Sequence, residues 1–338
     1  MIAKPRKTPL YILKLQALLR RLPPNHPKFP QVAEDLAKRM AGFKGELAAD
    51  YQLTLFGRKD WVMLADLRLP HGSTHFQLDT VLLTPAFALI LEVKNIAGTL
   101  YFDPEFNQLI RKKDGLETAF PDPILQSHRL EFQFAEWLER NRFPALPIHS
   151  LIVVSSHRSM IEAPPAHIKS LSRKIVRAEK LPFELKQLET QHKKVYLTEK
   201  EVKKLARSLN KSHMEADTRI TDKFSIPQTD LITGVFCPNC SCHLQRYKGG
   251  WLCGSCREKN NLAHVEALKD YRLLIGSTIT NKEIRGFLNL ESTSAASKLL
   301  HSLNLKSSGQ KKGRIYGLEL HEPLSDKPSA ENSIQSLN

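Results

Sequence analysis

The chain has 338 residues, of which 50 are Lys or Arg and 35 are Asp or Glu, so its formal net charge is +15. This length exceeds one typical domain, and a hydrophobic fraction of 41% excludes a chain that is disordered throughout. The excess charge lies in residues 158–211, with 14 basic and 6 acidic side chains, and in residues 237–319, with 13 and 6. Two basic segments predict a polyanionic partner, most simply nucleic acid, although a solvated surface would have the same composition.

The N-terminal part of the chain predicts helices. Residues 8–21 alternate Leu and Ile with Lys and Arg at helical spacing, and two prolines end this pattern. Apolar periodicity predicts a second helix over residues 30–55, which Gly42 and Gly45 could interrupt.

Strand-like segments follow. Three runs are separated by turns that contain Pro, and they cover residues 61–69, 76–83 and 86–93. The third run is apolar almost to its end, as in a central buried strand. A smaller hairpin, a helix and another buried strand are expected over residues 98–112, 125–142 and 151–154. The order of helix, three strands, helix and strand predicts an α/β fold with a mixed sheet flanked by helices.

The five cysteines all lie between residues 237 and 256, and four of them form two Cys-x-x-Cys pairs separated by twelve residues. The two pairs are Cys237 with Cys240 and Cys253 with Cys256. Four thiolates can bind one Zn²⁺ ion tetrahedrally, with no open position, which predicts a structural zinc. The pattern resembles the zinc ribbons that accompany many nucleic-acid enzymes. Cys242 or His243 could replace Cys240, so the ligand set stays open at this point.

The cysteine distribution also bears on the compartment. Because the first 236 residues contain no cysteine, a disulfide framework is excluded and a reducing, cytoplasmic compartment is expected. The longest apolar run is too short to span a bilayer, so no membrane association is expected.

The basic segment at residues 268–319 predicts a helix, a turn, a second helix and a wing. Residues 292–294 supply N-cap side chains for a helix over residues 295–303, and a Gly- and Lys-rich loop leads to a closing strand. This order resembles a winged helix-turn-helix, whose second helix enters the major groove of DNA. The side chains expected to contact bases or phosphates are Ser294, Ser297, Lys298, Lys311, Lys312 and Arg314. A small helical packing or dimerisation domain is the alternative.

Acidic and basic side chains meet at the ends of two expected strands. Asp79 lies on the second strand, and Glu92-Val93-Lys94 ends the third. Glu92 and Lys94 are two residues apart, so their side chains point to the same face, and an antiparallel neighbour would bring Asp79 beside them. Two carboxylates can bind Mg²⁺, and a lysine can orient or deprotonate the water that attacks a phosphodiester. The pattern therefore predicts metal-assisted hydrolysis; an ordinary surface ion pair is the alternative.

A set of motifs in residues 40–155 resembles the nuclease-related domain (NERD), a family related to the PD-(D/E)XK nucleases. The motifs are Gly45-Glu46, Phe76-Gln77-Leu78-Asp79, Glu92-Val93-Lys94-Asn95 with Gly98, and Asp122-Pro123-Ile124-Leu125-Gln126. The chain departs from the family pattern at Thr80, where His is common, and at Asp122, where Asn is common.

The resemblance implies a restriction-endonuclease-like core and a set of site residues. Asp79 and Glu92 would bind Mg²⁺ or Mn²⁺, and Lys94 would activate water. Glu46 would complete the metal shell or hold a metal-bound water, and Gln126 would orient the lysine, water or phosphate.

These patterns predict six segments and one function. The segments are an N-terminal helical segment (1–39), a nuclease-like domain (40–157), a basic helical region or linker (158–236), a zinc ribbon (237–258), a winged-helix-like module (268–319) and a disordered tail (320–338). The expected function is that of an Mg²⁺-dependent nuclease acting on DNA. The alternatives are a non-catalytic DNA-binding protein built on a nuclease scaffold and an RNA-directed nuclease. Deletion of residues 237–338 is expected to separate binding from cutting.

Overall fold

The computed structural model describes residues 1–56, 58 and 60–319 of the chain. The tail expected over residues 320–338 therefore lies outside the described residues. The described residues divide into two compact units: those within 1–12 and 33–218 belong to the first, and those within 13–32 and 219–319 belong to the second. None of the described helices combines the length and the apolar character that crossing a membrane requires.

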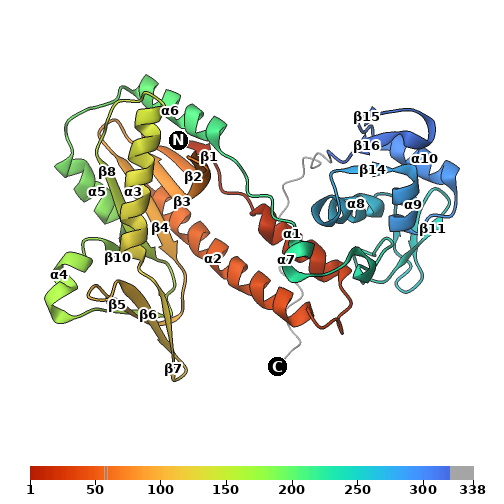
Figure 1. The fold of residues 1–338 in the computed structure, drawn as a ribbon, viewed down its shortest axis with the longest axis horizontal. Coiled ribbons are helices and arrows are strands. Elements are labelled where there is room, and N and C mark those ends of the chain that lie inside the picture. The colour runs from red at the N-terminus through yellow and green to blue at the C-terminus, as the bar shows by residue number, and fades with distance from the viewer. Residues whose placement is uncertain (57, 59, 320–338) are drawn as a thin grey trace. The chain divides into compact units, whose positions relative to one another are not determined.

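The first unit is organised around a six-stranded sheet with the order β1-β2-β3-β4-β8-β10 (Figure 1). Its strands are β1 (Ile2–Lys4), β2 (Val62–His71), β3 (Thr74–Leu83), β4 (Ala88–Lys94), β8 (Ile148–Val154) and β10 (Ile175–Arg177). β2, β3 and β4 pair antiparallel, whereas β1 pairs parallel with β2, and β8 pairs parallel with β4 and β10. The mixed sheet expected from the sequence is confirmed.

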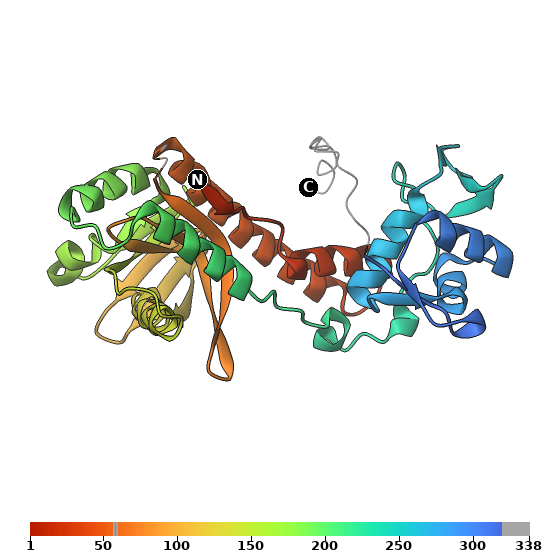
Figure 2. The ribbon, with the colours of Figure 1, turned by 90° about the horizontal axis from the view of Figure 1, so that it is seen from above.

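Helices pack on both faces of this sheet. The helices are α2 (Phe29–Phe56), α3 (Pro123–Arg140), α4 (Ile168–Leu171), α5 (Leu181–Gln191) and α6 (Glu199–Ser212). Apolar side chains of α3 and α6, such as Phe134 and Leu205, share one core cluster with β2, β3 and β4. Those of α2 and α5, such as Ala49 and Leu185, share another cluster with different residues of the same strands. The two pairs of helices therefore cover opposite faces of the sheet (Figure 2).

A second sheet of the first unit has the order β7-β6-β5-β9. Its strands are β5 (Gly98–Asp103), β6 (Gln108–Lys113), β7 (Leu116–Pro121) and β9 (Ser159–Glu162). β5 and β6 are the expected hairpin. β7 and β9 were not predicted, because most of their residues are exposed and they lack the apolar alternation that marks a strand. The segment expected to be a basic helical region thus also contains β9 and β10.

α2 is continuous across Gly42 and Gly45, so the break that these glycines suggested is wrong. Gly45 instead allows close packing of α2 against Asn95 and Ser155. A Cβ atom at this position would lie 2.4 Å from Cβ of Asn95 and 2.5 Å from Oγ of Ser155. Asn95 follows β4 and Ser155 follows β8, so the missing side chain lets α2 approach the ends of both strands. Nδ2 of Asn95 donates to the carbonyl oxygen of Ala41 at 2.7 Å and holds the helix there.

The second unit contains most of α1 (Leu10–Arg21) and the elements that follow residue 218. These elements are α7 (Ile220–Phe224), β11 (Leu244–Tyr247), β12 (Gly250–Cys253), β13 (Lys259–Asn260), α8 (Ala263–Leu274), β14 (Thr278–Thr280), α9 (Asn281–Leu288), α10 (Thr293–Ser302), β15 (Ser307–Ser308) and β16 (Ile315–Gly317). Two small sheets, β11-β12-β13 and β14-β16-β15, share one apolar core with α8, α9 and α10. Short 3-10 helices cover Pro165–His167, Ala178–Lys180, Gln228–Asp230 and Lys311–Gly313.

A buried arginine joins α1 to the core of the second unit. The side chain of Arg21 is 1% exposed, and its Nε donates to Asp270 at 2.8 Å. Its guanidinium lies over the rings of Phe236 and Phe287 and donates to the carbonyl oxygen of Gly234 at 2.7 Å. Because an unpaired buried charge is costly, these contacts bind α1 firmly to α8 and its surroundings.

Candidate functional site

Asp79 lies where β3 and β4 stop pairing. The last pair of this ladder is Thr80 with Leu91, and one position further along the same register Asp79 is opposite Glu92. The carboxylate of Asp79 accepts a hydrogen bond from the backbone N–H of Val93 at 2.9 Å. The side chain of Asp79 is therefore held beside the Glu92-Val93-Lys94 triplet.

Glu92, Lys94 and Gln126 form one hydrogen-bonded network between β4 and α3. Nζ of Lys94 donates to Oε1 of Glu92 at 2.7 Å and to Oε1 of Gln126 at 3.2 Å. Nε2 of Gln126 donates to the same oxygen of Glu92 at 2.7 Å. Glu92 is only 4% exposed, and burying a carboxylate is costly unless it is paired and hydrogen-bonded. The lysine and the glutamine provide that compensation and fix the three side chains relative to one another.

Glu46 comes from α2, directly after Gly45, and its carboxylate pairs with the guanidinium of Arg6. Arg6 lies in the segment between β1 and α1, and its side chain is 2% exposed. It also donates to both carboxylate oxygens of Asp50, at 2.7 and 3.1 Å. Glu46 and Asp50 are four residues apart and hence on one side of α2, so a single guanidinium binds both.

The same guanidinium reaches β3. It donates to the backbone carbonyl oxygen of Asp79 at 2.8 Å and to the hydroxyl of Thr80 at 2.7 Å. Arg6 was not predicted, because its contact with Glu46 spans 40 residues and no sequence spacing indicates it. Asp50 was not predicted either, although its spacing of four residues from Glu46 was an available signal.

Burial and mutual repulsion shift the pKa values of these acids. Burial raises the pKa of Asp79 well above its ordinary value, and the carboxylates of Glu92 and Glu46 raise it further. Burial likewise raises the pKa of Glu46, against the opposing effect of Arg6. Burial lowers the pKa of Arg6, but Asp50, Glu46 and Asp79 outweigh it, so that this pKa is raised. The group carries excess negative charge, which a cation would offset.

The donor set at this junction suits a hard divalent cation. Mg²⁺ and Mn²⁺ prefer carboxylate oxygens and complete their shells with water or substrate oxygens. Asp79 and Glu92 offer two such carboxylates, which lie opposite each other where the β3–β4 ladder ends. Among the described residues, only the cysteines treated below gather three or more potential ligand atoms within 4.8 Å of one another. An ion at the junction would therefore be held by few protein ligands.

The two departures from the resembled family have local structural roles. Thr80 is buried, and its hydroxyl accepts from Arg6 and donates to Asp50 at 3.1 Å. Asp122 caps α3, since its Oδ1 accepts from the backbone N–H of Ile124 at 2.9 Å. Asp and Asn are equivalent at an N-cap, so this departure preserves the cap of α3.

The four cysteines of the two Cys-x-x-Cys pairs form a compact cluster in the second unit. Sγ of Cys237 is 3.6 Å from that of Cys256, and Sγ of Cys240 is 3.4 Å from that of Cys253. Zn–S bonds of about 2.3 Å in a tetrahedron place the sulfur atoms about 3.8 Å apart. The cluster is thus consistent with a zinc-binding module. The backbone N–H of Cys256 lowers the pKa of the Cys253 thiol to about 6, whereas, against a hydrogen bond from the backbone of Cys242, the other three thiols raise the pKa of the Cys240 thiol to about 12.

Cys242 and His243, the alternative ligands, lie outside this cluster. Cys242 is exposed, and its backbone carbonyl oxygen accepts from the N–H of Cys237 at 2.8 Å. The ring of His243 packs on that of Phe236, with centroids 4.9 Å apart. Cys240 is therefore the cluster member, and Cys242 and His243 belong to the turn that follows it.

The serines and the lysine expected to contact nucleic acid on α10 differ in exposure. Ser294 and Lys298 are exposed. The hydroxyl of Ser297 accepts from Nδ2 of Asn281 at 3.0 Å, so it links α10 to α9. Ser297 thus has a packing role beside any contact with a ligand.

The basic residues expected in the wing lie between β15 and β16. Lys311 is exposed and Arg314 is partly exposed. The side chain of Lys312 lies outside the described part of the chain. Gly309 has a φ of +78° here, and a Cβ would lie 2.7 Å from the carbonyl oxygen of Gly313, so this loop requires glycine.

Comparison with known families identifies one region. Residues 41–155 match the family described as the nuclease-related domain, NERD. The match begins in α2, spans β2 to β8, and includes Glu46, Asp79, Glu92, Lys94 and Gln126. No curated protein and no solved structure matches the chain.

Proposed function

Because residues 41–155 are a nuclease-related domain, we propose that the protein is a metal-dependent nuclease that hydrolyses phosphodiester bonds of DNA. The observation that carries the proposal is the junction of α2, β3 and β4. Here Glu46, Asp79 and Glu92 repel one another, and Lys94 is bonded to Glu92. Lys94 and Arg6 offset part of this repulsion, and a divalent cation bound by Asp79 and Glu92 would offset the rest.

Asp79 and Glu92 are the proposed ligands of Mg²⁺ or Mn²⁺. When bound, the ion supplies Lewis-acid stabilisation of the charge that develops on the phosphate. The N–H of Val93 holds Asp79, and Gln126 holds Glu92, so both carboxylates are positioned in advance. Such preorganisation lowers the reorganisation needed during the reaction.

Lys94 is the proposed contact for the attacking water. An ammonium group has three N–H donors, and two of them are used on Glu92 and Gln126. The third can orient a water molecule or bind a phosphate oxygen beside the carboxylates. Gln126 sets the direction of Lys94 and in this way positions that third donor. Glu46 borders the group from α2 and pairs with Arg6.

The fold supports this assignment. A six-stranded mixed sheet with helices on both faces is compatible with a restriction-endonuclease-like core over residues 40–157. We further propose that residues 237–258 are a zinc ribbon whose Zn²⁺ is structural, because four thiolates leave no open position.

DNA is the proposed substrate because of the second unit. Its elements follow the order α8, β14, α9, α10, β15, β16, with a small sheet β14-β16-β15, which supports a winged-helix-like module over residues 268–319. In that arrangement α10 would enter the major groove, and Lys298 is exposed on it. Lys311 and Arg314 would contact backbone phosphates.

The proposal is tested with plasmid, linear duplex DNA, single-stranded DNA and RNA, each with Mg²⁺ or with Ca²⁺. We expect Mg²⁺-dependent cleavage of DNA that Asp79→Ala and Lys94→Ala abolish. Lys113→Ala, which removes a half-exposed lysine at the end of β6, is the matched control and should cut normally. Cleavage of RNA alone would assign an RNA-directed nuclease. DNA binding without cleavage in Mg²⁺ or Mn²⁺ would assign a non-catalytic DNA-binding protein.

A further inference from the structure

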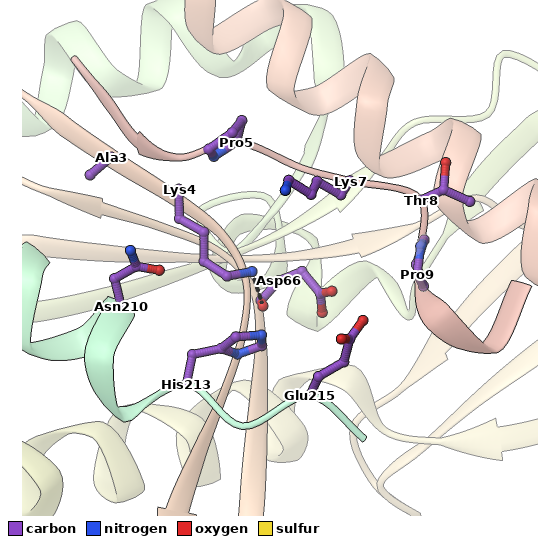
Figure 3. Close-up of a pocket in the computed structure, with 10 residues that line it drawn as sticks. All are labelled: Ala3, Lys4, Pro5, Lys7, Thr8, Pro9, Asp66, Asn210, His213 and Glu215. Carbon is purple, nitrogen blue, oxygen red and sulfur yellow. Dashed lines mark hydrogen bonds between the residues drawn. The ribbon is translucent and has the colours of Figure 1, made fainter. Parts of the chain in front are cut away.

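The N-terminal segment that carries Arg6 is fixed to the edge of the main sheet. β1 pairs parallel with β2, with Ile2 beside Met63 and Lys4 beside Leu64. Nζ of Lys4 donates to the carbonyl oxygens of Ala65 and Asp66 at 2.8 and 2.7 Å. Figure 3 shows the bond from this lysine to Asp66, and both residues line a pocket of about 330 Å³. Arg6 follows two residues later, so its position is set by strand pairing.

The carbonyl groups that bind Lys4 are presented by an irregularity of β2. Asp66 has a φ of +50°, which is rare for a residue other than glycine. It lies between Ala65 and Leu67, which pair with Thr80 and Leu78 of β3. Asp66 is therefore opposite Asp79, where the acids gather. This unusual backbone turns toward Lys4 and anchors the segment beside the site.

The charges at the junction leave room for one divalent cation. Glu46, Asp50, Asp79 and Glu92 are four carboxylates, and Arg6 and Lys94 are the two cations bonded to them, while the charge of nearby Asp66 is offset by that of Lys4. Full ionisation of all six groups leaves two negative charges, the amount that one Mg²⁺ or Mn²⁺ ion balances. A second ion would have to displace Arg6, whose guanidinium is almost fully buried and has five hydrogen bonds to Glu46, Asp50, Asp79 and Thr80.

We propose that Arg6 is a built-in cation of this site, which neutralises Glu46 and Asp50 and leaves Asp79 and Glu92 alone to hold a single divalent ion. This inference rests on the proposed nuclease function. It makes Glu46 a positioning residue, since Glu46 acts through Arg6 on the backbone of Asp79. It also makes residues 1–9, which lie outside the matched NERD region, part of the active site.

The test measures Mn²⁺ binding to the zinc-loaded, full-length protein by electron paramagnetic resonance of the free ion. The wild type should bind one Mn²⁺ ion at this site. Glu46→Gln keeps an acceptor for Arg6 and should change the affinity by less than about threefold, as should its control Glu34→Gln on the exposed part of α2. Arg6→Gln frees two carboxylates and should bind a second ion, or the first about tenfold more tightly, whereas Arg6→Lys should bind one ion as the wild type does.

The outcomes separate this inference from the proposed function. Asp79→Asn should abolish the Mn²⁺ site; if its binding equals that of the wild type, both the proposed function and the role of Arg6 are wrong. If Asp79→Asn loses the ion and Glu46→Gln also weakens binding by about tenfold or more, Glu46 is a metal ligand and only the inference fails. An unchanged stoichiometry and affinity in folded Arg6→Gln would overturn it as well. The Mn²⁺ affinity of Glu46→Gln still tests the inference if the Arg6→Gln variant does not fold.

Discussion

Replacing Gly45 with Ala should separate α2 from the strand ends that carry the candidate site. The added Cβ would lie 2.4 Å from Cβ of Asn95, whereas carbon atoms in contact are about 3.5–4.0 Å apart, so the helix or the strand must move by more than about 1 Å. Gly42→Ala is the matched control, because it lies in the same helix and a Cβ there meets nothing within 4 Å.

Both substitutions gain about 1 kcal/mol of helix propensity. The difference in unfolding free energy between the two variants therefore isolates the cost of overpacking at Gly45, which is about 1–3 kcal/mol. For a unit of this size, we expect the melting temperature of Gly45→Ala to lie on the order of 2–10 °C below that of Gly42→Ala. Calorimetry of the full chain measures both transitions. A displacement of about 1 Å beside Lys94 should also slow cleavage by about 100-fold. Equal melting temperatures and equal cleavage rates of the two variants would refute the packing argument.

Four further outcomes are expected. One zinc ion per chain should be found by elemental analysis, and Cys253→Ser should lose it; a zinc content far below one in the wild type would refute the four-cysteine site. Because the folded-state pKa of Asp79 is raised, the metal-free wild type loses stability as the pH rises through that pKa. The stability of Asp79→Asn, measured relative to that of the wild type, should therefore be higher at about pH 8 than at about pH 4. Thermal unfolding measures this gain, and a difference that does not depend on pH would contradict it. Asp270→Ala leaves Arg21 buried without its carboxylate and should destabilise the second unit by about 3–5 kcal/mol in urea unfolding, while an unchanged midpoint would count against that pairing. Lys298→Ala should weaken DNA binding in fluorescence anisotropy and lower the salt slope by about one, whereas an unchanged slope would exclude a phosphate contact.

The part of the candidate site that short-range spacing determines could be predicted from sequence. Glu92 and Lys94 share a face because strand side chains alternate, and one antiparallel turn is enough to bring Asp79 beside them. Gln126 sits in the first turns of a helix that Pro123 marks. Each of these positions depends on local periodicity and on adjacent strands, which a sequence pattern records.

Arg6 could not be predicted, because its place depends on the pairing of β1 with β2 across about sixty residues. β1 has only three residues and an exposed start, so no periodicity marks it. Gly45 was noticed but misinterpreted: the sequence shows a helix-weakening residue, and only the packing of Asn95 and Ser155 shows why a side chain is excluded.

The second unit contains residues from both ends of the described chain, so truncating the C-terminal part would disrupt it. Residues 13–32 belong to it, and Arg21 is bonded to Asp270 across 249 residues. Deletion of residues 237–338 would therefore leave Arg21 without its buried partner Asp270. Substitution of exposed basic residues such as Lys298 is the cleaner way to separate binding from cutting.

The most direct test of the central claim is the single-turnover rate of DNA cleavage by the wild type and by Lys94→Ala, at saturating Mg²⁺ and with all DNA bound. We expect the rate to fall by about 10²–10⁴-fold while the affinity for DNA changes by less than about twofold. A Lys94→Ala protein that cuts bound DNA at nearly the wild-type rate would show that the chemistry does not occur at the junction of β3 and β4.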